Sequence, residues 1–119
     1  MSVEVTLRIY NPKTDEAFIY ATWTQQKWYS NKKNRKKRSI DREWLTQECK
    51  EIKNILLCSH VWIACFKEDP GFILGYIVID NGRLQFMYVK QNYRGSGVED
   101  LLLTQIRGEQ DEQKLRETH

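Results

Sequence analysis

Residues 88–98 read Tyr-Val-Lys-Gln-Asn-Tyr-Arg-Gly-Ser-Gly-Val, and three leucines follow at positions 101–103. This order predicts a β-strand that ends in a glycine-spaced turn and then opens a helix. Because the first N–H groups of a helix have no acceptor within it, such a turn aims unpaired amides at one point and favours an anion there. Gly95 and Gly97 permit positive φ and present no Cβ to a ligand, and Arg94 adds a positive charge. The spacing fits neither a P-loop nor the dinucleotide fingerprint, since Gly-Lys-Ser/Thr and a third glycine are both missing.

Two apolar segments precede this turn. Residues 61–65 read Val-Trp-Ile-Ala-Cys, and residues 73–78 read Ile-Leu-Gly-Tyr-Ile-Val. With the turn, this series over residues 40–106 resembles the GCN5-related N-acetyltransferase (GNAT) family, whose signature is a Val-x-x-x-Tyr-Arg-Gly-x-Gly-Ile/Val turn. The likeness is strongest to the compact acetyltransferase-like proteins of tailed phages. The resemblance implies an N-acetyltransferase that moves an acetyl group from acetyl coenzyme A to an amine of a small molecule or of a protein lysine.

The resemblance also implies which residues bind the coenzyme. The amides of Met87, Tyr88 and Val89 would face the thioester and pantetheine. The amides of a second group would face the pyrophosphate, and this group consists of Arg94, Gly95, Ser96, Gly97 and Val98.

The catalytic and acceptor residues are less clearly marked. Candidates for a base are Tyr88, His60 and Asp80, and the sequence selects none of them. Trp28 and Tyr29 are candidates for an acceptor pocket, because an aromatic face attracts the cation of an amine.

The chain departs from the family pattern in two ways. Glu99 stands where the family has a small residue, and Asp100 follows it; these carboxylates suit a helix start but would repel a pyrophosphate. The family also continues past its third helix with a strand, a helix and two more strands. Their absence predicts that strand 83–90 has an open edge, which a second copy or a protein partner would complete.

The predicted fold class is α+β, a GNAT-like, mostly antiparallel sheet of about four strands flanked by three helices. One domain is expected over residues 1–119, with a basic loop at 31–39 and a charged tail at 108–119 that frays. The first helix is expected to be capped by Thr14 or Asp15, and Asn81-Gly82 to form a two-residue hairpin. Strands are predicted at 3–10, 60–67, 72–80 and 83–90, and helices from about 14 to 29, from 39–41 to 56 and from 98 to about 113.

Composition limits the class of protein. No apolar stretch reaches the roughly 20 residues needed to cross a bilayer, so no membrane partner is expected. The start of the chain lacks a basic region followed by an apolar one, which predicts a cytoplasmic protein, in the host cytoplasm or the virion if phage-encoded. Cys49, Cys58 and Cys65 lack the spacing of a disulfide framework or a metal site, so no metal is predicted.

The basic loop suggests a second possible function. Such a block can bind a phosphate backbone or an acidic protein face, or it can be a solvated, mobile loop. The alternative to an enzyme is therefore a noncatalytic GNAT-fold accessory or virion protein that binds a protein or nucleic acid through this loop and the open edge. The six cations of the loop are Lys32, Lys33, Arg35, Lys36, Lys37 and Arg38.

Overall fold

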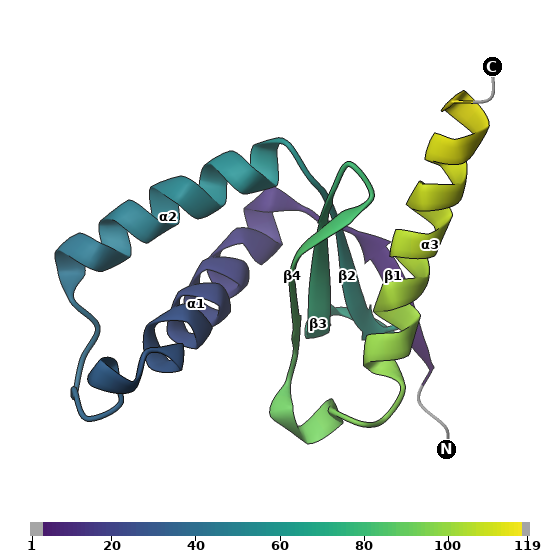
Figure 1. The fold of residues 1–119 in the computed structure, drawn as a ribbon. Helices are drawn as coiled ribbons and strands as arrows, with labels where there is room; N and C mark the ends of the chain where they lie inside the picture. Colours follow the sequence, from purple (N-terminus) through teal and green to yellow (C-terminus); the bar gives the residue numbers. More distant parts are fainter. Residues whose placement is uncertain (1–3, 118–119) are drawn as a thin grey trace. The chain divides into compact units, whose positions relative to one another are not determined.

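The computed structural model describes the backbone of residues 4–117 and the side chains of residues 4–111. The described chain has three α-helices and a four-stranded antiparallel sheet, which confirms the predicted α+β class (Figure 1). It divides into two compact units, residues 11–58 and the remainder on either side of them. The single domain expected over residues 1–119 stays a prediction.

The larger unit contains the sheet, whose strands follow one another in chain order. These are β1 (Val5–Ile9), β2 (His60–Phe66), β3 (Asp69–Asp80) and β4 (Arg83–Val89), and each pairs antiparallel with the next. The β3–β4 turn has positive φ at Asn81 (54°) and Gly82 (74°). Positive φ at both central residues is the requirement of a type I′ hairpin turn, so the hairpin prediction is confirmed.

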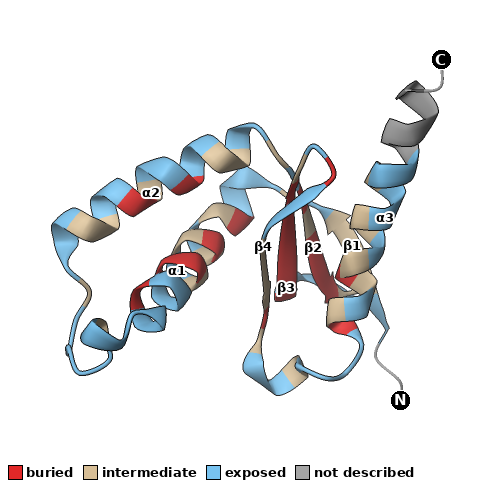
Figure 2. Ribbon diagram, viewed as in Figure 1, coloured by how far each residue is buried: buried red, intermediate tan, exposed pale blue. Residues whose placement is uncertain are grey.

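Helix α3 (Val98–Glu117) packs against one face of this sheet and completes a hydrophobic core (Figure 2). Val98 and Leu102 of the helix are buried there with residues of β2, β3 and β4. The sheet members of this cluster are Ala64, Leu74, Ile77, Ile79 and Val89. The core therefore fixes the start of α3 beside the end of β4, which is where the glycine turn lies.

Gly75 explains the Leu-Gly-Tyr sequence of β3. A Cβ added to this residue would lie 2.4 Å from the carbonyl oxygen of Tyr88 and 3.1 Å from Cα of Val89. Glycine thus allows β3 to approach the last residues of β4 closely. Glycine is thus required at position 75 by close packing against the backbone of β4, and not by a positive φ.

Three predicted boundaries were wrong. Helix α1 (Pro12–Ser30) is capped by Asn11, whose side chain accepts from the N–H of Lys13, and Pro12 occupies the first helical position. Asp15 is not the cap residue; it is buried and accepts a 2.8 Å hydrogen bond from the Asn11 N–H.

Strand β3 begins at Asp69 rather than residue 72, since the irregular register between Asp69 and Ile73 accommodates Pro70.

The third wrong boundary is that of α3, which runs to Glu117 and so includes most of the tail predicted to fray. Glu, Gln, Lys and Arg dominate residues 109–117, and all four are good helix formers. Gln110 in this segment donates a 3.2 Å hydrogen bond to the carbonyl oxygen of Gly82. Residues 118–119 of the predicted tail and residue 3 of the first predicted strand lie outside the described chain.

The smaller unit is a pair of helices joined by the basic loop. Helix α2 (Arg42–Leu57) is capped by Asp41, within the range of 39–41 predicted for its start. The loop contains a short 3₁₀ turn, η1 (Lys32–Asn34). The two helices are linked by a 2.7 Å ion pair between Lys27 and Glu48 and by the rings of Trp28 and Trp44, 4.8 Å apart between centroids.

Candidate functional site

The two glycines of the turn have the backbone conformation that the sequence predicts. Gly95 has φ +80° and Gly97 has φ +97°. A Cβ built on either glycine meets no atom within 4 Å, so the space beside both residues is open. The turn therefore presents bare backbone to an approaching group, as an anion site requires.

Fewer amides of the turn are free than the sequence suggested. The N–H of Arg94 donates to the carbonyl oxygen of Gln91, and that of Ser96 to the carbonyl oxygen of Tyr93, each at 3.3 Å. The N–H of Gly95 donates to the Glu99 carboxylate, also at 3.3 Å. Of the five amides from Arg94 to Val98, only those of Gly97 and Val98 lack an acceptor among the described residues.

Glu99 thus occupies part of the turn that the resemblance gives to a pyrophosphate. Its carboxylate carries the negative charge that the helix start favours. The side chain is half-buried, and Oε2 accepts one long hydrogen bond, that from Gly95. An anionic ligand at this point would have to displace the carboxylate.

The residues before the turn anchor it to the sheet. The Nε–H of Arg94 donates a 3.0 Å hydrogen bond to the carbonyl oxygen of Val89, so its guanidinium lies against the end of β4. The Tyr93 ring packs edge-on against Phe66 and Phe72, with centroids 5.9 and 6.4 Å away. Lys90 places its ammonium 4.2 Å from the centroid of the Phe72 ring.

Strand β4 forms one edge of the described sheet. Val89 is buried in the core, whereas Met87 and Tyr88 are half-buried. The ring of Tyr88 lies 5.8 Å from that of Tyr76, its partner across β3 and β4. Met87, Tyr88 and Val89 are therefore continuous with the turn along an edge that pairs only with β3 in the described chain.

The three candidate bases do not lie together. Tyr88 is next to Val89 and the turn. His60 pairs with Ile79, and Asp80 with Arg83, at the hairpin end of the sheet. About five residues of strand, roughly 17 Å, separate this end from Val89. Of the three, Tyr88 alone is thus near the turn, because the antiparallel register puts the start of β2 beside the end of β3.

Trp28 and Tyr29 lie in the smaller unit. Trp28 is 3% exposed, and its Nε1 has no acceptor among the described residues. Its ring contacts that of Trp44, and the Lys37 ammonium lies 5.2 Å from the centroid of the Trp28 ring. Tyr29 is 40% exposed. Of the two predicted acceptor residues, only Tyr29 therefore presents its ring to solvent.

The basic loop is an ordered turn as well as a charged one. The Asn31 side chain accepts from the N–H of Lys33 at 3.0 Å, and the Asn34 side chain donates to the carbonyl oxygen of Trp28 at 3.0 Å. None of its six cations pairs with a carboxylate of the described residues. The loop is therefore a concentrated, uncompensated positive charge.

Other chemical groups add little to these sites. The described residues contain no group of three or more His, Cys, Asp or Glu that could hold a metal ion. Burial, and then the charge of Glu48, raise the pKa of the Cys49 thiol above its ordinary value. Helices α1 to α3, as far as the structure describes them, lack the length of apolar sequence that a bilayer span needs.

Three solved structures share this fold. A GNAT-family acetyltransferase from Staphylococcus aureus Mu50 matches 93% of this chain and 68% of its own, with 21% identity and a TM-score of 0.58. Apo-form YjaB from Escherichia coli matches 87% of this chain and 64% of its own, with 14% identity and a TM-score of 0.57. The third is a GCN5-related glucosamine N-acetyltransferase region in a fungal multi-domain β-N-acetylglucosaminidase, at 18% identity and a TM-score of 0.59, covering 89% of this chain and 12% of that one.

The sequence itself gives no comparable match. No protein-family model matches the chain, and no curated protein matches it either. Since all three structural likenesses are below 25% identity, they bear on the fold and leave activity aside. The chain has a GNAT-like α+β fold.

Proposed function

We propose that the chain binds acetyl coenzyme A at the turn 94–98 and along β4, and transfers the acetyl group to an amine. The observation that carries this proposal is the pair of positive-φ glycines, open on their exposed side, at the start of α3 in a GNAT-like fold. The free N–H groups of Gly97 and Val98 fit a phosphate oxygen, and Arg94, which belongs to the same turn, supplies a positive charge.

The backbone of β4 would supply alignment. Acetyl coenzyme A would provide the thioester. As the amine nitrogen bonds to the carbonyl carbon and loses a proton, the C–S bond would break, and coenzyme A would leave as a thiolate that takes up a proton. The N–H groups of Met87 and Val89 face the open edge, because that of Lys90 donates to Leu74 of β3 and successive residues alternate. These two are suited to hold the pantetheine and to stabilise the oxygen of the reacting carbonyl. Tyr88 is the one candidate base that adjoins the turn, and its assignment to the proton transfer is part of this proposal.

Glu99 is the residue that fits this function least. Two unit charges about 4 Å apart repel by roughly 1 kcal/mol in water, and by more in a less polar site. Pyrophosphate binding would therefore require the carboxylate to rotate away from Gly95 into solvent. The single 3.3 Å hydrogen bond that it would lose is of a strength that two phosphate contacts can replace.

A thermal-shift titration with acetyl coenzyme A tests the proposal. A ligand that binds only the folded chain stabilises it by about 2.7 kcal/mol at a hundredfold excess over Kd. The wild-type chain is expected to show a saturable rise in Tm, and Arg94→Ala with Gly97→Val to show none relative to its own unliganded Tm. An equal rise in Tm in the wild type and the double variant would mean that the coenzyme binds away from the turn. No rise in the wild type would refute binding.

A second function is favoured by the Glu99–Gly95 contact. If the carboxylate permanently fills the turn, the fold is a noncatalytic scaffold whose basic loop binds an anionic partner. We propose this role as the alternative, as an accessory or virion protein if the chain is phage-encoded. The same titration separates the two, since the scaffold would show no coenzyme-dependent rise in Tm.

A further inference from the structure

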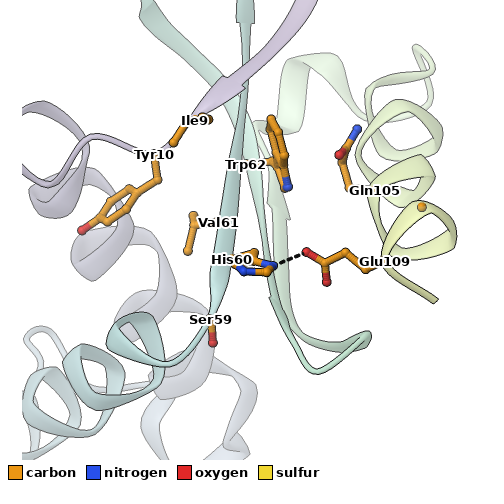
Figure 3. Close-up of a pocket in the computed structure, with 9 residues that line it drawn as sticks. Ile9, Tyr10, Ser59, His60, Val61, Trp62, Gln105 and Glu109 are labelled. Carbon is orange, nitrogen blue, oxygen red and sulfur yellow. Dashed lines mark hydrogen bonds and ion pairs between the residues drawn. The ribbon is translucent and has the colours of Figure 1, made fainter. Parts of the chain in front are cut away.

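A cavity lies in the larger unit, between the start of β2 and the later turns of α3. It has a volume of about 440 Å³, which is within the usual range for small-molecule sites. Figure 3 shows Trp62, Gln105 and Glu109 gathered between β2 and α3, with His60 at the start of β2. Glu109 is eleven residues beyond Val98 along α3, a rise of roughly 16 Å, so this cavity is separate from the glycine turn.

The cavity contains one carboxylate that is largely withdrawn from solvent. The side chain of Glu109 is 16% exposed, and its Oε1 lies 2.6 Å from Nδ1 of His60. Because a carboxylate only accepts hydrogen bonds, Nδ1 carries the proton of this contact. The His60 side chain is 77% exposed, so this partner lies at the mouth and leaves the remaining lone pairs of Glu109 open to a ligand.

The rest of the lining suits a positively charged ligand with an apolar body. The lining includes no lysine or arginine, so the carboxylate has no fixed cation beside it. Ile9 is 73% exposed and pairs with Trp62 across β1 and β2, which gives the cavity an apolar wall. The face of an indole ring attracts a cation, and the neighbouring carboxylate adds the attraction of its negative charge. An anion would meet repulsion from Glu109 and find no lysine or arginine in the lining.

We propose that this cavity binds a small organic amine. The protonated amine donates hydrogen bonds to Glu109, and the hydrocarbon part lies against Trp62 and Ile9. Gln105, one turn before Glu109 on the same face of α3, offers an amide to a polar substituent of the ligand. The site stands apart from the proposed acyl transfer, since it uses none of the residues of the turn or of β4.

Three probes of similar size distinguish the amine from other ligands: phenethylamine, phenethyl alcohol and 3-phenylpropionate. Binding to the full chain can be followed by the NMR resonances of the Trp62 indole N–H and the Gly108 amide. We expect phenethylamine to shift both resonances saturably at concentrations up to about 10 mM, and the alcohol and the acid to bind at least about tenfold more weakly. Equal shifts by all three probes, or no shift with phenethylamine, would overturn the proposal.

Variants test the role of the carboxylate. Glu109→Gln should weaken phenethylamine binding about tenfold or more, whereas Asp111→Asn, an exposed carboxylate change on the same helix, should leave it unchanged. His60→Asn should retain binding, because it removes only the competing partner of Glu109. Well-dispersed spectra and Tm values confirm that the variants are folded. Unchanged affinity in Glu109→Gln, or loss of binding in Asp111→Asn, would contradict the assignment.

Discussion

The carboxylate of Glu99 accepts a hydrogen bond from the backbone N–H of Gly95 at 3.3 Å, across the turn that leads into α3. This contact satisfies an amide that would otherwise be available to an anion. It also places a negative charge where a GNAT-like fold would hold a pyrophosphate. The strength of the proposed coenzyme binding would thus depend on how readily Glu99 moves away from Gly95.

Removing the charge of Glu99 should strengthen coenzyme binding. For Glu99→Gln we expect Kd for acetyl coenzyme A to fall about fivefold or more, which corresponds to roughly 1 kcal/mol of relieved repulsion. Isothermal titration calorimetry measures this directly. Asp100→Asn is the matched control, since that exposed carboxylate makes no contact with the turn amides, and its effect should be smaller. A weaker affinity in Glu99→Gln would mean that the carboxylate supports the bound state.

Gly75→Ala should destabilise the chain. The new Cβ would meet the Tyr88 carbonyl oxygen at 2.4 Å, so β3 and β4 would have to move apart. Overpacking of this kind costs about 1–3 kcal/mol, and Tm should fall by about 4 °C or more. Gly71→Ala is the control, because its nearest neighbour would be a side-chain oxygen at 3.7 Å, and its Tm should hardly change. Equal Tm values for the two variants would contradict the close approach of β3 and β4.

The basic loop should bind polyanions with a strong dependence on salt. We expect a single-stranded oligonucleotide to lose about 300-fold in affinity between 50 and 200 mM salt if all six cations contact phosphates. Replacing Lys36 and Arg38 by Gln should reduce the slope of log K against log salt by about 1.4. Fluorescence anisotropy provides the measurement. The control replaces Lys50 and Lys53 of α2 by Gln, and a similar loss of slope there would show that net charge, rather than the loop, binds the oligonucleotide.

The three cysteines should react with iodoacetamide in a fixed order. Cys58 is exposed, Cys49 is half-buried with a raised thiol pKa, and Cys65 is fully buried in β2. Because the thiolate is the nucleophile, we expect Cys58 to be alkylated first, Cys49 more slowly and Cys65 only on unfolding. Mass spectrometry of timed samples at pH 7.5 gives the order, and in urea the differences should largely disappear. Faster labelling of Cys49 than of Cys58 would contradict this arrangement.

The sequence predicts those features whose cause is local. Asn81-Gly82 specifies a type I′ turn because few other residue pairs accept positive φ twice, and Gly95 and Gly97 follow the same logic. Asp41 was predictable as a cap because its carboxylate can accept from the free N–H groups at a helix start. The cap of α1 was missed because Thr14 and Asp15 are also good cap residues, although Asn followed by Pro is typical of the cap and first position of a helix.

Features that depend on distant contacts could not be predicted. Glu109 was assigned to a charged tail, yet it meets His60 across 49 residues of sequence. The sequence could not select among Tyr88, His60 and Asp80, because it does not show which ends of the strands meet. The hydrogen bond between Glu99 and Gly95 is local, but its formation depends on a side-chain rotamer that charge patterning alone does not specify.

The most direct test of the central claim is to follow the backbone amide resonances of Gly97 and Val98 by NMR while acetyl coenzyme A is added. Coenzyme binding at the turn predicts large, saturable shifts of these two amides, together with a change at Gly95 as Glu99 releases it. If Gly97 and Val98 stay unshifted at saturating coenzyme, the turn does not hold the pyrophosphate and the proposed acetyl transfer is refuted.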